Sequence, residues 1–253
     1  MYRAADDDGV SYGQIDRAVR TIDDLDGPAK TRAERLVRQT DGDGLRLIDE
    51  LDGDSLQRVL DLDIDRATEF RSAAARNHGQ GVAATDDVDA FARHADDLQG
   101  VDGLNSGPVE DFITAGDPGN VQGAVREVRR ADEIGAANIE RMDLEVYDGK
   151  RQIGELDIQR TNGEVVESKS TFGYSADEID TQFDRKLQTM MDHDDVAFDG
   201  NAFEVRATQV GDEDLVRSKV AEWENRVANS GEWNNAEVTI RVVDESDGSV
   251  ITN

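Results

Sequence analysis

The chain has 253 residues, and its 57 Asp and Glu outnumber its 28 Lys and Arg, so its formal net charge is -29. The sequence contains no cysteine, which excludes disulfides, cysteine-ligated zinc and a thiol nucleophile. No apolar run approaches the roughly 18 residues of a membrane helix, and the N-terminus lacks the apolar core of a signal peptide. We therefore expect a soluble protein with no membrane partner.

The acidity is typical of proteins that work in concentrated salt. Molar salt shortens the Debye length to roughly 3 Å, which screens the self-repulsion of such a chain. Lysine is scarce, with five residues, and neither half of the chain has a basic surplus. We expect a cytoplasmic protein of a halophilic archaeon, with delivery into other cells as the alternative. The excess of acidic residues is then an adaptation to the salt-rich solvent and does not indicate what the protein binds.

The first half of the chain is predicted to be an all-α module. Apolar residues recur at helical spacing, as in Ile15, Val19 and Ile22. Breaks rich in Asp and Gly separate the expected helices, which cover residues 15–25, 30–39, 44–51, 55–60, 64–76, 87–98 and 109–114. A segment rich in Gly and Pro at 116–120 ends this half, and we place the domain boundary between residues 117 and 118.

The pattern changes in the second half, residues 118–253. A helix is expected at 121–134, and alternating residues at 139–170 predict a three-stranded meander. A helix at 176–192, a strand at 203–210, a helix at 212–228 and a strand at 237–243 follow. The predicted fold class is α/β, or more broadly α+β.

A cluster of charged residues is expected on two neighbouring strands of the meander. Glu155 and Asp157 share one face of their strand, and Glu167 and Lys169 share one face of the next, because side chains alternate along a strand. Three carboxylates and an ammonium suit metal-dependent hydrolysis of a phosphodiester, because oxygen ligands hold Mg²⁺ and a cation positions the attacking water. The alternative is a solvated hairpin with cross-strand ion pairs.

Asp157, followed after nine residues by Glu167-Ser168-Lys169, resembles the motif of the PD-(D/E)XK nuclease superfamily, and the resemblance covers roughly residues 121–210. It implies a restriction-endonuclease-like α-β-β-β-α-β core, with a mixed sheet flanked by helices. It also implies that Asp157, Glu167 and the backbone carbonyl of Ser168 bind Mg²⁺ or Mn²⁺, and that Lys169 orients the attacking water. Leu156 stands where the family often has proline.

Four further residues are candidates for the same site. The resemblance implies a glutamate on the first core helix, and Glu127 occupies that place. Glu155 is an additional candidate metal ligand. Gln182 and Lys186 lie four residues apart on one helical face and are candidates for contacting the scissile phosphate, although an exposed ion-paired face explains their spacing equally well.

The expected function is that of a Mg²⁺-dependent endonuclease that cuts DNA rather than RNA and acts as a toxin or effector. The alternatives are an RNA-cleaving toxin of the same fold that acts on transfer RNA, a DNA repair or processing nuclease, and an inactive nuclease-fold scaffold. The helical half is expected to bind an inhibitor, an immunity protein or a delivery partner. Because so acidic a protein gains little from counterion release, nucleic-acid binding is expected to depend on the metal and on local arginines.

Overall fold

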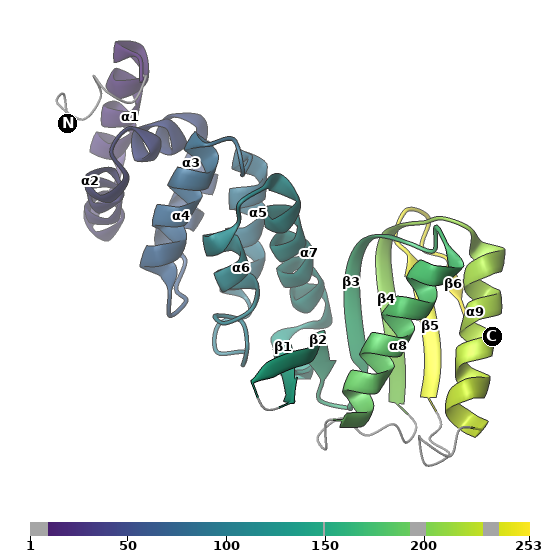
Figure 1. The fold of residues 1–253 in the computed structure, drawn as a ribbon. Helices are drawn as coiled ribbons and strands as arrows, with labels where there is room; N and C mark the ends of the chain where they lie inside the picture. Colours follow the sequence, from purple (N-terminus) through teal and green to yellow (C-terminus); the bar gives the residue numbers. More distant parts are fainter. Residues whose placement is uncertain (1–9, 149, 193–200, 230–237) are drawn as a thin grey trace. The chain divides into compact units, whose positions relative to one another are not determined.

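The structure is a computed structural model that describes residues 10–148, 150–192, 201–229 and 238–253. The chain divides into two compact units, which are described separately (Figure 1). The helical unit comprises residues 1–100 and 104–133, and the sheet unit comprises residues 101–103 and 134–253. The protein is therefore of mixed α+β composition, with one helical unit and one unit that combines a sheet with helices.

The helical unit confirms the predicted helical first half. Its helices are α1 (Tyr12–Asp24), α2 (Gly27–Glu50), α3 (Gly53–Asp61), α4 (Ala67–Gly79), α5 (Thr85–Asp96), α6 (Pro108–Thr114) and α7 (Pro118–Ile134). The element α2 consists of two helices that meet at Asp41, where φ is 48° and ψ is -123°, in agreement with the two helices expected at 30–39 and 44–51. No helix in the described part of the chain is long and apolar enough to cross a membrane.

Helix α7 belongs to the helical unit as far as Glu133. Asp132 on this helix pairs with Nδ1 of His94 on α5 at 2.8 Å, which joins α7 to the helices that precede it. The division between the units therefore falls near residue 134, whereas the sequence placed it between residues 117 and 118. Glu127, the candidate on α7, accordingly lies in the helical unit.

The sheet unit contains a mixed sheet. Its strands are β1 (Ile139–Asp148), β2 (Arg151–Arg160), β3 (Val165–Phe172), β4 (Asn201–Val210), β5 (Val238–Asp244) and β6 (Val250–Ile251). In the described residues they lie in the order β1-β2-β3-β4-β5-β6. β1, β2 and β3 form the predicted antiparallel meander, whereas β4 is parallel to both β3 and β5. The two-residue strand β6 was not predicted, because it is too short to show alternation.

Two helices cover one face of this sheet. α8 (Ala176–Asp192) connects β3 to β4, and α9 (Glu213–Asn229) connects β4 to β5 (Figure 1). Phe203 and Val205 of β4 belong to one hydrophobic cluster with Phe183 of α8 and Trp223 of α9. Because side chains alternate along a strand, Glu204, which lies between Phe203 and Val205, points to the opposite face.

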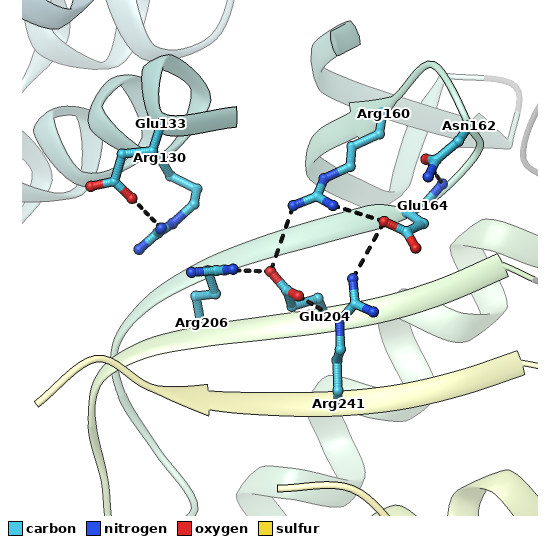
Figure 2. Close-up of polar contacts among 8 residues, drawn as sticks. All are labelled: Arg130, Glu133, Arg160, Asn162, Glu164, Glu204, Arg206 and Arg241. Atoms are coloured by element: carbon cyan, nitrogen blue, oxygen red, sulfur yellow. Dashed lines mark hydrogen bonds and ion pairs between the residues drawn. The ribbon is translucent and has the colours of Figure 1, made fainter. Parts of the chain in front are cut away.

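On that opposite face, three arginines surround the buried carboxylate of Glu204, which is 3% exposed (Figure 2). Nε of Arg241 lies 2.5 Å from Oε2, Arg206 donates to Oε1, and Nη2 of Arg160 lies 3.9 Å from Oε1. Arg160 and Arg241 also pair with Glu164, at 2.8 and 3.3 Å. Burial raises the pKa of Glu204, but hydrogen bonds and charge from Arg206 and Arg241 bring it below its ordinary value.

Candidate active site

The strands β2 and β3 separate where the predicted site begins. They pair as a ladder at only two positions, next to the turn that connects them. Beyond these positions, Oε1 of Glu167 accepts a hydrogen bond from the backbone N–H of Asp157 at 3.2 Å, and Oδ2 of Asp157 accepts one from the backbone N–H of Ser168 at 2.8 Å. These bonds from side chain to main chain replace ladder bonds and hold both carboxylates between the strands.

Two lysines, one from the sheet and one from helix α8, neutralise these carboxylates. Nζ of Lys169 lies 3.1 Å from Oε2 of Glu167 and 3.8 Å from Oδ2 of Asp157. Nζ of Lys186 lies 2.7 Å from Oε2 of Glu167 and 3.5 Å from Oδ1 of Asp157. Lys186 also donates to the backbone carbonyl of Glu155. Two of the five lysines in the chain thus meet at one pair of acids.

The four charged groups are largely removed from water. Glu167 is fully buried, Asp157 is 8% exposed and Lys186 is 6% exposed. Burial raises the pKa of Asp157, but the ammonium groups of Lys169 and Lys186 outweigh burial and lower it to about 2. Burial and the charge on Asp157 raise the pKa of Glu167. Burial lowers the pKa of both lysines, but the two carboxylates outweigh it and raise the pKa overall, so both lysines remain charged.

A cavity of about 660 Å³ opens beside these groups. Its volume lies within the range of roughly 300–1,000 Å³ that is typical of ligand sites. The lining residues come from β2, β3 and α8, and they are Arg151, Gln152, Gly154, Glu155, Asp157, Lys169, Gln182, Arg185 and Lys186. The cavity gives a ligand access to the edge of the carboxylate pair.

A close approach of α8 to β2 places Lys186 in this site. A Cβ atom on Gly154 would lie 1.7 Å from Oγ1 of Thr189, so only glycine fits at this point of β2. Thr189 is 1% exposed and lies one helical turn beyond Lys186. The contact lets the lysine reach the main chain of β2 and, beyond it, the two carboxylates.

The structure brings together four of the predicted residues, Asp157, Glu167, Lys169 and Lys186. The full burial of Glu167 differs from the exposed face that the solvated-hairpin alternative requires. Lys186 contacts the carboxylates, and not the residues of its own helix face that the ion-paired alternative would use.

Three other predicted residues are not part of this group of four. Gln182 lines the cavity from α8. Glu155 also lines it, but its side chain is exposed and Oε2 accepts from Nε2 of Gln152 at 3.4 Å, so it does not join the carboxylate pair. Glu127 is not among the residues that the sheet unit brings together, because it belongs to the helical unit.

The donor set suits a hard divalent cation. Asp157 and Glu167 already surround one cation, the ammonium of Lys186, which contacts an oxygen of each carboxylate. Within the described ranges, no three side chains of His, Cys, Asp or Glu form a metal-binding group. A metal held here would therefore have two carboxylate ligands, with main-chain or water oxygens completing its shell, as is common for Mg²⁺.

The part of the site that the sequence missed is the role of Lys186 as a partner of the carboxylates. The scarcity of lysine was the available signal, because one of only five lysines stands in the motif and another, Lys186, lies on the helix that follows it. Arg151 and Arg185, which also line the cavity, carried no signal, since isolated arginines are common on helices and strands. Comparison of the chain with protein-family models, curated proteins and solved structures finds no significant match.

Proposed function

We propose that the sheet unit is a metal-dependent nuclease of the PD-(D/E)XK type that cuts DNA in preference to RNA. The observation that carries the proposal is the pair of buried carboxylates, Asp157 and Glu167, held between adjacent strands with Lys169 two residues beyond Glu167. The order of the elements within the sheet unit supports it, because the meander, α8 and a strand parallel to β3 follow one another as in the β-β-β-α-β part of such a core.

Each residue of the site has a separate role in the proposed reaction. Asp157, Glu167 and the backbone carbonyl of Ser168 would hold Mg²⁺ or Mn²⁺. When bound, the ion supplies an activated water and neutralises negative charge on the phosphate. The ammonium of Lys169, whose side chain is 28% exposed and lines the cavity, orients the water for attack on phosphorus. Before the ion binds, the buried ammonium of Lys186 would hold the two carboxylates in place, and the ion would take over this role.

The cavity itself suits a phosphodiester. Among the described residues, four basic side chains line it and two acidic ones, Glu155 and Asp157, do so. This described lining is therefore more basic than acidic, although the chain as a whole carries a formal charge of -29. Gln182 and Arg185 reach the cavity from α8 and would contact the phosphate by hydrogen bonds that survive high salt better than long-range attraction does.

The proposed biological setting is that of a toxin or effector in a halophilic archaeon. The sheet unit would carry the chemistry, and the helical unit would bind an inhibitor or a delivery partner. The separation of the chain into two compact units supports this division of labour. The strongly acidic composition supports the high-salt setting.

A cleavage assay tests the proposal. The full chain is incubated in concentrated KCl with plasmid DNA or total RNA, and with Mg²⁺, Mn²⁺ or EDTA. We expect metal-dependent cutting of DNA that is lost in Asp157→Asn and Lys169→Met and retained in Lys150→Met, which removes an exposed lysine of the same unit.

Three outcomes would count against the proposal. Intact DNA and RNA with all folded proteins would favour a binding or scaffold protein. Cleavage of RNA alone would contradict DNA as the substrate but would support metal-dependent hydrolysis of a phosphodiester. Cutting by Asp157→Asn at the wild-type rate would remove this site from consideration.

A further inference from the structure

Three arginines of the helical unit gather around a small cavity between α2 and α4. Its volume is about 170 Å³, and it is lined by Arg32, Arg35, Leu36, Gln39, Thr68 and Arg71. Within the described part of the chain no acidic side chain lines this cavity, although the sequence has about twice as many acidic as basic residues. The cavity therefore concentrates positive charge in an acidic protein.

Arg71 is the buried member of the group. It is 9% exposed, and its Nη1 atom is buried without a hydrogen-bond acceptor among the described residues. Nη2 lies 3.5 Å from the backbone carbonyl of Leu62, at the limit of a hydrogen bond, and none of the described carboxylates forms an ion pair with the guanidinium. A buried charge without a counter-charge destabilises the folded state, because the charged group has lost its hydration and no ion pair replaces it.

The neighbouring arginines add to the excess of charge. Arg35 has an exposed side chain and makes no ion pair or hydrogen bond within the described ranges, whereas Arg32 pairs with Asp61 at 2.5 Å. Burial lowers the pKa of Arg71 to about 10, and the charges on Arg32 and Arg35 add to this lowering. The carboxylates of Asp61 and Asp63 act in the opposite direction but offset only part of the charge of the three guanidinium groups.

Two neutral side chains complete the lining. Oε1 of Gln39 accepts a hydrogen bond from Oγ of Ser72 at 3.1 Å, so the NH₂ group of this amide is the donor that remains for a ligand. The hydroxyl of Thr68 is a second neutral donor at the cavity. Planar guanidinium groups and neutral donors are the groups that bind tetrahedral oxyanions in proteins.

We propose that this cavity binds one phosphate group, with Arg71 and Arg35 as its main ligands. The volume lies below the roughly 300–1,000 Å³ of sites that enclose a whole small molecule, so the cavity takes a single phosphate and leaves the rest of the ligand outside. The phosphate belongs either to a small phosphate monoester or to a nucleic-acid backbone. The proposal is independent of the nuclease site, because every residue it uses lies in the helical unit.

Calorimetric titration of the full chain with inorganic phosphate, at an ionic strength held constant with KCl, tests the proposal. We expect binding that weakens about tenfold in Arg71→Met, the effect of losing a charged hydrogen-bond donor, and that also weakens in Arg35→Gln. Arg38→Gln is the matched control, because Arg38 lies on the same helix, is exposed and pairs with Glu34. Its affinity should stay within about twofold of the wild-type value.

The variants separate this site from others on the protein. Because Arg35 is exposed, Arg35→Gln remains informative even if Arg71→Met fails to fold, and circular dichroism checks the fold of each. Phosphate held elsewhere, for example at the carboxylate site, would not respond to Arg35→Gln. Absence of phosphate binding in the wild-type protein, or unchanged affinity in folded Arg71→Met and Arg35→Gln, would overturn the proposal.

Competition experiments identify the source of the phosphate. A nucleoside monophosphate that displaces inorganic phosphate supports a small monoester, and an oligonucleotide without terminal phosphates that displaces it supports a nucleic-acid backbone. Failure of both to compete would overturn the assignment of the ligand as a phosphate group of a larger molecule.

Discussion

Nζ of Lys186 lies 2.7 Å from Oε2 of Glu167 and 3.5 Å from Oδ1 of Asp157, so one helical side chain joins the carboxylates of two strands. Both carboxylates are buried, and their mutual repulsion is offset by this ammonium and by that of Lys169. The site is thus built to hold positive charge between two acids. A divalent cation would compete with the ammonium of Lys186 for the same oxygens.

Replacing Lys186 should make the site depend on metal. We expect Lys186→Met to lower the free energy of unfolding by about 3 kcal/mol in EDTA, because it leaves buried carboxylates with one ammonium fewer. Mn²⁺ should restore much of this loss, since it replaces the missing charge. Urea denaturation with and without Mn²⁺ measures both effects, and Lys150→Met is the control. Equal stabilisation of wild type and Lys186→Met by Mn²⁺ would contradict this expectation.

Lys169→Met should affect chemistry more than metal binding. The proposed role of this ammonium is to orient water, and the loss of such a positioned group costs about 100-fold or more in rate. We expect kcat to fall by that factor while the affinity for Mn²⁺ stays the same or rises, because a positive neighbour of the ligands is removed. Single-turnover cleavage and Mn²⁺ titration provide the two values. A fall in Mn²⁺ affinity that accounts for the whole loss of rate would argue against this role.

The contact between Gly154 and Thr189 should be essential for docking α8 on β2. Gly154→Ala would place a methyl group 1.7 Å from Oγ1 of Thr189, and we expect a loss of about 2 kcal/mol of stability from overpacking. Thr189→Ala in the same chain should recover part of it, because it removes Oγ1. Gly53→Ala, which meets no atom within 4 Å, is the control for the loss of a glycine. Additive effects of the two substitutions at 154 and 189 would contradict the proposed contact.

Glu204 should make the sheet unit sensitive to acid. Its pKa in the folded protein is lower than in the unfolded chain, where we take its ordinary value of 4.5. Between the two values the unfolded chain binds more protons, so the stability that Glu204 contributes is complete above the unfolded pKa and is lost as the pH falls through the folded one. We expect Glu204→Gln to cost about 3 kcal/mol at neutral pH, because three arginines lose their central acid.

Urea denaturation of wild type and Glu204→Gln over a series of pH values measures this dependence. The difference in stability between the two proteins should shrink as the pH falls below 4.5. A difference that is independent of pH would mean that Glu204 contributes through packing rather than through charge.

The sequence predicted the parts of the fold that local patterns determine. Helical periodicity located the helices of the first half, and strict alternation located the meander that carries Asp157 and Glu167. The Asp/Gly break from which the sequence predicted the end of a helix contains Asp41, whose backbone is not helical. This single residue with positive φ separates the two helices of α2.

The features that the sequence did not predict depend on contacts between distant segments. Lys186 reaches the carboxylates only because Gly154 lets α8 approach β2, and no local pattern encodes that approach. The ring of arginines around Glu204 likewise joins residues from three strands. The spacing of residues along the chain could predict on which face of a helix or strand a side chain lies. Which residues it contacts there depends on the packing of the whole unit.

The most direct test of the central claim is a crystal structure of the full chain soaked with Mn²⁺ and measured for anomalous scattering. We predict a peak bound by carboxylate oxygens of both Asp157 and Glu167, with the ammonium of Lys186 displaced from between them. Strong peaks elsewhere, with Lys186 still bound to both carboxylates at saturating Mn²⁺, would contradict the assignment of these two acids as the metal site of a nuclease.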